Sequence, residues 1–156
     1  MIGKVYSQNV HKNRQWTQQL LTTLYDEYDL ILIQEPPYYH VKNIPSGDNS
    51  EGVPEHDTCH DPKWSKVFFN TNVSVYVNEK VLRTHSLFLF PSFDPNIIAL
   101  TLHNIEKEDD IHFINCYNDT SKDTLRNLLS FLERQALQDT VIMGDFNLHS
   151  DRKSVV

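Results

Sequence analysis

The stretch Thr140-Val141-Ile142-Met143-Gly144-Asp145-Phe146-Asn147-Leu148-His149 decides how the chain is interpreted. Its apolar first half is typical of a buried β-strand. A carboxylate, an amide and an imidazole then follow at alternate positions, and side chains two residues apart lie on one face of an extended chain. We therefore expect a core strand to carry Asp145, Asn147 and His149 to one edge of a sheet. A plain strand followed by a polar turn would give the same local pattern, so other parts of the chain must decide.

The length and composition indicate one folded domain over residues 1–156. Hydrophobic residues make up 39% and aromatic residues 11% of the chain, which suits a globular protein. The net charge of −7 argues against binding nucleic acid through bulk positive charge, although a nuclease can use a metal ion as its local positive charge. Cys59 and Cys116 are the only cysteines and lack the spacing of a zinc or disulfide framework. No apolar run is long enough to span a bilayer, so we expect no membrane partner.

A second strand with a polar end lies at Leu30-Ile31-Leu32-Ile33, an apolar run that fits a fully buried parallel strand. Two prolines end it and leave Glu35 at its carboxyl end. Upstream, residues 4–9 are predicted to form a strand that ends at Asn9, and residues 13–25 a helix capped by its first residue. Strand, helix and strand together form a βαβ unit. Open sheets keep their binding sites at the carboxyl ends of such strands.

The middle of the chain is rich in strand patterns. Residues 66–70 and 73–77 are predicted to form a hairpin. Further predictions are strands at 87–90, 97–102 and 111–117, an acidic hairpin turn at 106–110, and a helix that follows a capping-box pattern at 120–123 and ends near Ala136.

Residues 36–66 form a long stretch that the sequence predicts to be irregular, and such a stretch in a compact domain is usually functional or disordered. His56, Cys59 and His60 in this stretch are metal-ligand types, but a fourth ligand is not evident. We therefore do not expect a zinc site there. The role of the stretch stays open.

Polar groups thus stand at four predicted strand ends: Asn9, Glu35, Tyr117 with Asn118, and Asp145 with Asn147. They converge if the strands share one end of a sheet. Mg²⁺ prefers hard oxygen ligands, commonly one or two carboxylates with water and phosphate oxygens, and Glu35 suits this role. Asp145 suits a group that orients or deprotonates an attacking water, with the two neighbouring amides to orient it. Tyr117 can donate a hydrogen bond to a phosphoryl oxygen.

The segments that carry these groups resemble the endonuclease/exonuclease/phosphatase superfamily, which includes deoxyribonuclease I. They are Gln8-Asn9, Leu30-Ile31-Leu32-Ile33-Gln34-Glu35-Pro36, Asn115-Cys116-Tyr117-Asn118-Asp119 and Gly144-Asp145-Phe146-Asn147. The closer resemblance, from about Val5 to Ser150, is to the endonuclease domains of non-LTR retroelement polyproteins, especially fungal ones. These share Trp16-Thr17, Gln34-Glu35-Pro36-Pro37, Pro45-Ser46, Glu51-Gly52 and the Gly-Asp-Phe-Asn-x-His-Ser pattern at 144–150.

The resemblance implies an α+β fold, the deoxyribonuclease I-like four-layer α/β sandwich, and Mg²⁺- or Mn²⁺-dependent hydrolysis of phosphodiester bonds. The implied partner is DNA, contacted through its phosphate backbone. The implied location is intracellular, and nuclear for a functional retroelement enzyme. By motif, Glu35 is implied as the metal ligand with Asn9 beside it, Tyr117 as a phosphate contact, Asp145 and Asn147 as the groups that position and activate water, and Asn118 and His149 as substrate contacts.

The chain departs from this pattern at two points. Some relatives have Asp two residues after the first Asn, where this chain has His11. The family also continues past Gly-Asp-Phe-Asn to a Ser-Asp-His motif that this sequence lacks. We therefore expect a C-terminally truncated domain, represented mainly by its N-terminal part, whose activity is in question. A truncated sandwich would also leave an apolar sheet face uncovered, which favours self-association.

Three functions stay open at this point. The first is a DNA endonuclease of retroelement descent, and the second is a non-catalytic remnant or binding module of the same fold. The third is a phosphatase that acts on a small phosphoester, because the superfamily hosts both reactions and a fold does not fix a substrate. The acidic charge balance favours the third function over the first, whereas the closer motif resemblance favours the first.

Overall fold

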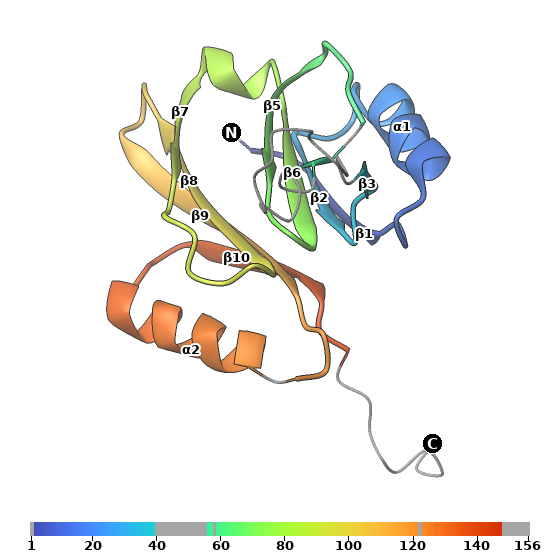
Figure 1. The fold of residues 1–156 in the computed structure, drawn as a ribbon. Helices are drawn as coiled ribbons and strands as arrows, with labels where there is room; N and C mark the ends of the chain where they lie inside the picture. The colour runs from blue at the N-terminus through green and yellow to red at the C-terminus, as the bar shows by residue number, and fades with distance from the viewer. Residues whose placement is uncertain (1, 40–55, 58, 122, 148–156) are drawn as a thin grey trace, which may run out of the picture.

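Two four-stranded β-sheets lie face to face in the computed structural model, and one helix covers the outer side of each (Figure 1). The structure describes residues 2–39, 56–57, 59–121 and 123–147. Mixed sheets with two helices make this an α+β fold, as predicted.

The first sheet has the order β1-β2-β6-β5, with β1 at Val5–Asn9, β2 at Leu30–Gln34, β6 at Val73–Asn78 and β5 at Trp64–Phe69. Helix α1, Arg14–Thr23, connects β1 to β2, which run parallel. Asn13 is its N-cap and accepts a hydrogen bond from the Trp16 backbone N–H at 2.9 Å. The predicted βαβ unit is therefore confirmed.

The second sheet repeats this arrangement with the order β10-β9-β8-β7. A short 3₁₀ helix, η1 at Val81–Arg83, leads from β6 into β7 at His85–Leu89, which is followed by β8 at Ile97–Asn104 and β9 at Asp109–Tyr117. Helix α2, Asp123–Gln135, then connects β9 to the parallel strand β10 at Thr140–Asp145.

Two sequence predictions need correction. The acidic turn was expected at 106–110, but Asp109 and Asp110 belong to β9, where they pair with Asn104 and His103 of β8. Both side chains are exposed at the start of this strand, so charged residues can occupy it. The stretch 36–66 was expected to be irregular, but β3, Tyr38–Tyr39, pairs with β4, His56–Asp57, and β5 begins at Trp64.

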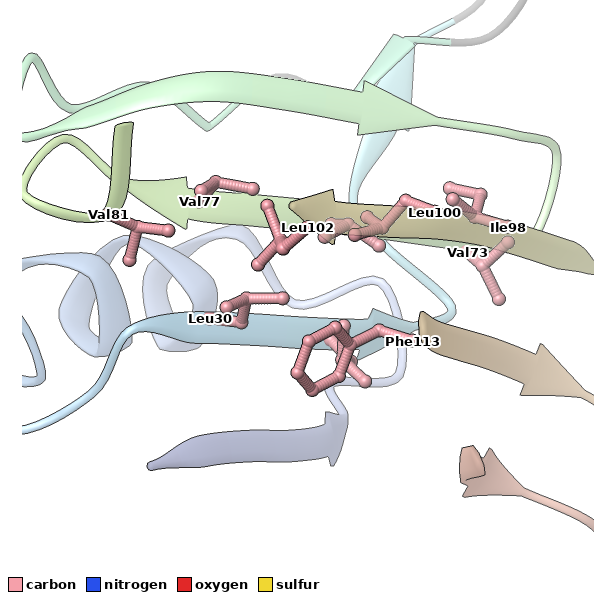
Figure 2. Packing of buried hydrophobic residues seen from close by; sticks show 10 residues of the cluster. Leu30, Val73, Val77, Val81, Ile98, Leu100, Leu102 and Phe113 are labelled. Carbon is pink, nitrogen blue, oxygen red and sulfur yellow. The ribbon is translucent and has the colours of Figure 1, made fainter. Parts of the chain in front are cut away.

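The space between the sheets is filled by branched aliphatic side chains. Leu30 and Leu32 of the first sheet pack with Leu100, Leu102 and their neighbours from the second sheet (Figure 2). All four are fully buried. Burying side chains of this kind contributes about 1.5–3 kcal/mol each to folding.

The outer face of each sheet is covered as well. Leu20 and Leu21 of α1 pack on Ile31 and Ile33 of β2. On the other side of the molecule, α2 packs on the second sheet. The buried residues of this cluster are Ile97, Ala99, Ile114, Cys116, Leu128 and Phe131. The described residues therefore form four layers, because each sheet packs one face on the other sheet and carries a helix on its outer face. The self-association expected through an uncovered sheet face has no support here.

Cys116 lies on β9, in the hydrophobic cluster between the second sheet and α2, and is fully buried. Burial, with a smaller contribution from the charge of Asp94, raises the pKa of its thiol to about 12. Because the thiolate is the reactive form, only roughly one thiol in 10⁴ would be ionised at pH 8. We expect Cys116 to resist iodoacetamide at pH 8 in the folded chain and to react in urea, as measured by mass spectrometry of the labelled peptide. Rapid labelling without urea would contradict this burial.

No helix among the described residues is long and apolar enough to cross a membrane.

Candidate active site at the strand ends

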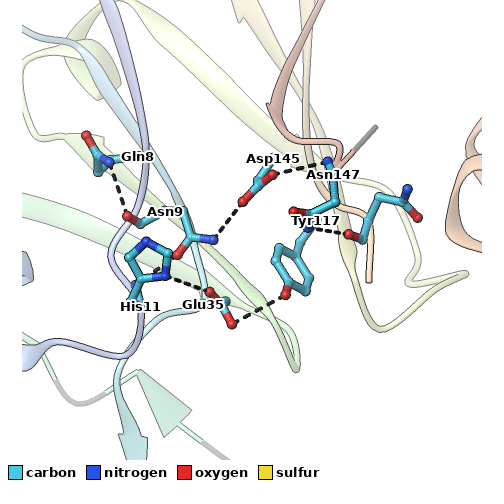
Figure 3. A network of polar contacts seen from close by, with 8 residues as sticks. Gln8, Asn9, His11, Glu35, Tyr117, Asp145 and Asn147 are labelled. Atoms are coloured by element: carbon cyan, nitrogen blue, oxygen red, sulfur yellow. Dashed lines mark hydrogen bonds and ion pairs between the residues drawn. The ribbon is translucent and has the colours of Figure 1, made fainter. Parts of the chain in front are cut away.

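The carboxyl ends of β1, β2, β9 and β10 meet at one end of the sandwich (Figure 3). Each sheet contributes one parallel pair, in which Asn9 lies opposite Gln34 and Asp145 lies opposite Tyr117. A crossover helix joins the two strands of each pair and makes them parallel. The carboxyl ends of both strands, with the polar residues that follow them, therefore lie at the same edge of the sheet. The two pairs then face each other across the gap between the sheets.

Asp145 is held from both sides. Its Oδ2 accepts a hydrogen bond from Asn9 Nδ2 at 2.8 Å, across 136 positions of sequence, and its Oδ1 accepts one from the backbone N–H of Asn147 at 3.2 Å. Two neutral donors orient the carboxylate without a cation. Of the two amides predicted to orient Asp145, Asn9 contacts it through its side chain, whereas Asn147 contacts it through its backbone N–H and donates its Nδ2 to the carbonyl of Asn118.

Glu35 forms a second group beside this one. Its Oε1 accepts a hydrogen bond from the Tyr117 hydroxyl at 3.3 Å, and its Oε2 lies 3.2 Å from Nδ1 of His11. The Glu35 side chain remains 23% exposed, so solvent and small ions can reach it. Burial, followed by the negative charge of Glu35, raises the pKa of Tyr117 above its usual value. Tyr117 therefore keeps its proton near neutral pH and acts as a hydrogen-bond donor.

Asn118 joins the ends of the two parallel strands. Its backbone N–H donates to Asp145 O at 2.8 Å, its Nδ2 donates to Phe146 O at 2.7 Å, and its own carbonyl accepts from Asn147 Nδ2 at 2.6 Å. Asn118 is only 1% exposed, and within the described part of the chain its buried Oδ1 has no hydrogen-bond partner. This geometry gives Asn118 a positioning role, while the substrate contact predicted for it stays a prediction. His149 lies outside the described residues.

The backbone at the site is strained. Glu35 has φ of +50° and Asn147 has φ of +46°, and His11 in the turn after β1 has φ of +51°. Residues with side chains adopt this left-handed region at a cost of about 1–3 kcal/mol, and such residues concentrate at functional sites. Glu35 follows directly after the buried strand β2, and its left-handed conformation turns the chain out of the strand at this point.

A buried amide pair beneath the site was not singled out by sequence reasoning. Gln34 Nε2 donates to Asn115 Oδ1 at 2.7 Å, and Asn115 Nδ2 donates to the backbone carbonyls of Ile33 and Ser74, both at 2.9 Å. Gln34 is 1% exposed and Asn115 is fully buried. This pair ties the two sheets together directly under Glu35 and Tyr117. The available signal was a polar amide within each of two otherwise apolar strands.

We expect Asn115→Leu to lower the free energy of unfolding by about 2–4 kcal/mol, because it removes the three buried hydrogen bonds that Asn115 makes to Gln34, Ile33 and Ser74 of the other sheet. Urea unfolding followed by circular dichroism measures this loss. Gln19→Ala, an exposed amide on α1, is the control and should cost less than about 0.5 kcal/mol. Equal stability of the two variants would contradict the role of the amide pair.

The donor set at the strand ends fits a hard divalent cation. It offers two carboxylates, amide oxygens and a phenol. Among the described residues, no three His, Cys, Asp or Glu side chains are grouped closely enough to hold a metal ion alone. Mg²⁺ commonly uses one or two carboxylates and completes its coordination with water and phosphate oxygens. Glu35 can supply such a carboxylate.

Comparisons with solved structures identify the fold. The endonuclease domain of TRAS1, a telomere-specific non-LTR retrotransposon, matches with a TM-score of 0.60 at 14% identity, over 94% of this chain and 61% of that domain. A β-hairpin deletion mutant of β toxin from Staphylococcus aureus matches with a TM-score of 0.52 at 13% identity, over 96% of this chain and 69% of the toxin. The chain has the deoxyribonuclease I-like fold, and the fold prediction is confirmed. No protein-family model and no curated protein matches the chain.

Proposed function

We propose that residues 1–156 form an endonuclease/exonuclease/phosphatase domain that hydrolyses DNA phosphodiester bonds with Mg²⁺ or Mn²⁺, and that it descends from a retroelement endonuclease. The observation that supports this most directly is the 2.8 Å hydrogen bond between Asn9 and Asp145, because it joins two candidate catalytic residues from different sheets. The contact between Glu35 and Tyr117 at the same strand ends supports the proposal as well.

The candidate residues divide into a metal-binding group and a water-activating group. Glu35 would hold the metal ion, with Asn9 beside it, and the ion would supply the positive charge that stabilises the phosphoryl oxygens. Asp145 would orient the attacking water and accept its proton, while Asn9 Nδ2 and the backbone N–H of Asn147 keep the carboxylate in place. Asn147 would also contact a phosphate oxygen.

The hydroxyl of Tyr117 would donate a hydrogen bond to a phosphoryl oxygen of the substrate. Its present bond to Glu35 is long, at 3.3 Å, so exchanging it for a bond to a more highly charged oxygen costs little. The raised pKa of Tyr117 supports this role, because a protonated phenol is needed as the donor.

DNA is the substrate that the comparisons favour, because the TRAS1 domain is described as an endonuclease of a retrotransposon. An enzyme of this descent would act in the nucleus. With a net charge of −7, the chain would contact the DNA phosphates through its metal ion more than through surface lysines and arginines.

The same charge supports a second candidate, a phosphatase that acts on a small soluble phosphoester. A small phosphoester would contact only the site itself. It would therefore avoid most of the electrostatic repulsion that the acidic surface of the chain exerts on the phosphates of DNA.

A nicking assay separates these functions. The folded chain is incubated with supercoiled plasmid DNA and, in parallel, with soluble phosphate monoesters and diesters, each with Mg²⁺ or Mn²⁺ or with a chelator. We expect nicked plasmid only when metal is present, and none with Glu35→Gln. Hydrolysis of the soluble esters alone would replace the endonuclease by the phosphatase. No hydrolysis of any substrate by a folded chain would contradict catalysis and leave a binding module.

A further inference from the structure

His11 is a titratable side chain at the site for which the proposed hydrolysis gives no role. It follows β1 by two residues, and its Nδ1 lies 3.2 Å from Oε2 of Glu35 (Figure 3). Its imidazole can offer a nitrogen lone pair to an ion, which the Tyr117 hydroxyl on the other oxygen of Glu35 cannot. The question is what an imidazole beside this carboxylate does.

The turn that carries His11 is built to place it there. The His11 backbone N–H donates to Asn9 Oδ1 at 2.8 Å, and the next residue, Lys12, donates its backbone N–H to Glu35 O at 2.7 Å. Both residues have positive φ, +51° and +60°. Two strained residues and two hydrogen bonds therefore fix the turn against the ends of β1 and β2. The imidazole is held beside Glu35 by its backbone and does not merely reach it from a flexible stem.

Stability does not explain this contact. The His11 side chain is 71% exposed and that of Glu35 is 23% exposed. Exposed ion pairs stabilise a fold very little, and less than the strain of this turn costs. The exposure also leaves the ring open to an incoming ion. His103 and Asp110 provide a comparison, since their 2.6 Å pair spans regular strands of β8 and β9 without a strained turn.

We propose that His11 is a second protein ligand of the divalent ion held by Glu35. This rests on the proposed function, whose metal it makes more specific. A nitrogen donor favours ions that accept imidazole, such as Ni²⁺, Co²⁺ and Mn²⁺, over Mg²⁺, which prefers oxygen. The ratio of Ni²⁺ to Mg²⁺ affinity is therefore set by His11, whereas Glu35 contributes to the affinity for both ions.

Titration calorimetry with NiCl₂ and MgCl₂ tests this without any activity assay. His11→Ala should weaken Ni²⁺ binding by about tenfold or more and Mg²⁺ binding by less than about threefold. Glu35→Gln should weaken both. His103→Ala, the matched control from the second histidine–carboxylate pair, should leave the site that depends on Glu35 unchanged. Circular dichroism confirms that each variant is folded, which is expected because His11 and His103 are not core residues.

A spectroscopic measurement separates coordination from a general electrostatic effect. Bound Mn²⁺ should give nitrogen modulation in pulsed electron paramagnetic resonance, and this signal should vanish in His11→Ala and persist in His103→Ala. Equal loss of Ni²⁺ and Mg²⁺ affinity in His11→Ala, no loss of either, or a nitrogen signal that persists would overturn the assignment of His11 alone. Unchanged metal binding in Glu35→Gln would instead refute the metal site of the proposed function.

Discussion

Asp145→Asn is expected to lower the rate of metal-dependent phosphodiester hydrolysis by about 10²- to 10⁴-fold, the usual contribution of a positioned general base. The amide has nearly the shape of the carboxylate but cannot accept the proton of the attacking water. It also has only one acceptor oxygen, whereas Asp145 accepts hydrogen bonds on both, from Asn9 Nδ2 and from the Asn147 backbone. The variant should remain folded, because Asp145 is only partly buried.

Asp139→Asn is the matched control for this change. Asp139 lies immediately before β10, is exposed, and has φ of +47°, a conformation that asparagine tolerates. Because Asp139 and Asp145 lie at opposite ends of the same strand, the control removes a carboxylate without touching the site. Plasmid nicking under single-turnover conditions gives the two rates. If both variants nick at the wild-type rate, Asp145 is not the base and the assignment of the water-activating group fails.

Gly144→Ala is expected to destabilise the chain by about 3 kcal/mol or more. A Cβ at this position would meet the Cys116 carbonyl oxygen at 1.9 Å and the carbonyl carbon at 2.8 Å. These are backbone atoms of the neighbouring parallel strand and cannot move aside as the end of a side chain can. Gly144 also has φ of +154°, a conformation that residues with side chains rarely adopt. The strand would have to shift, and Asp145 would shift with it.

Urea unfolding measures this effect, with Gly3→Ala as the control. A Cβ at Gly3 would approach Asp29 Oδ2 at 3.5 Å, an ordinary contact, so we expect a change below about 0.5 kcal/mol. Since domains are stable by only about 5–15 kcal/mol, Gly144→Ala should also reduce the yield of folded protein. A Gly144→Ala variant as stable as Gly3→Ala would show that β9 and β10 can separate without cost.

The buried strands could be predicted because their pattern is local. Leu30 to Ile33 is a continuous apolar run between a polar turn and prolines, and the structure buries all four side chains as part of β2. The helix after β1 could be placed for the same reason, since its N-cap asparagine and its apolar stripe are both visible within a few turns of sequence. The acidic turn was misplaced because charged residues at an exposed hairpin resemble a turn and a strand equally.

The positions of Asn9, Glu35, Tyr117 and Asp145 at the ends of predicted strands could be inferred from the amino-acid sequence, and with them the class of chemistry to expect. Which of these groups meet depends on the packing of the two sheets. Asn9 contacts Asp145, whereas Glu35 contacts Tyr117 and His11, and all three contacts join residues that are distant in sequence. The physical reason is that strand periodicity fixes which face a side chain occupies, whereas the packing of one sheet on another fixes its neighbours across the gap. The coverage of both sheets by α1 and α2 was decided in the same way, because no local pattern records which face a helix will find.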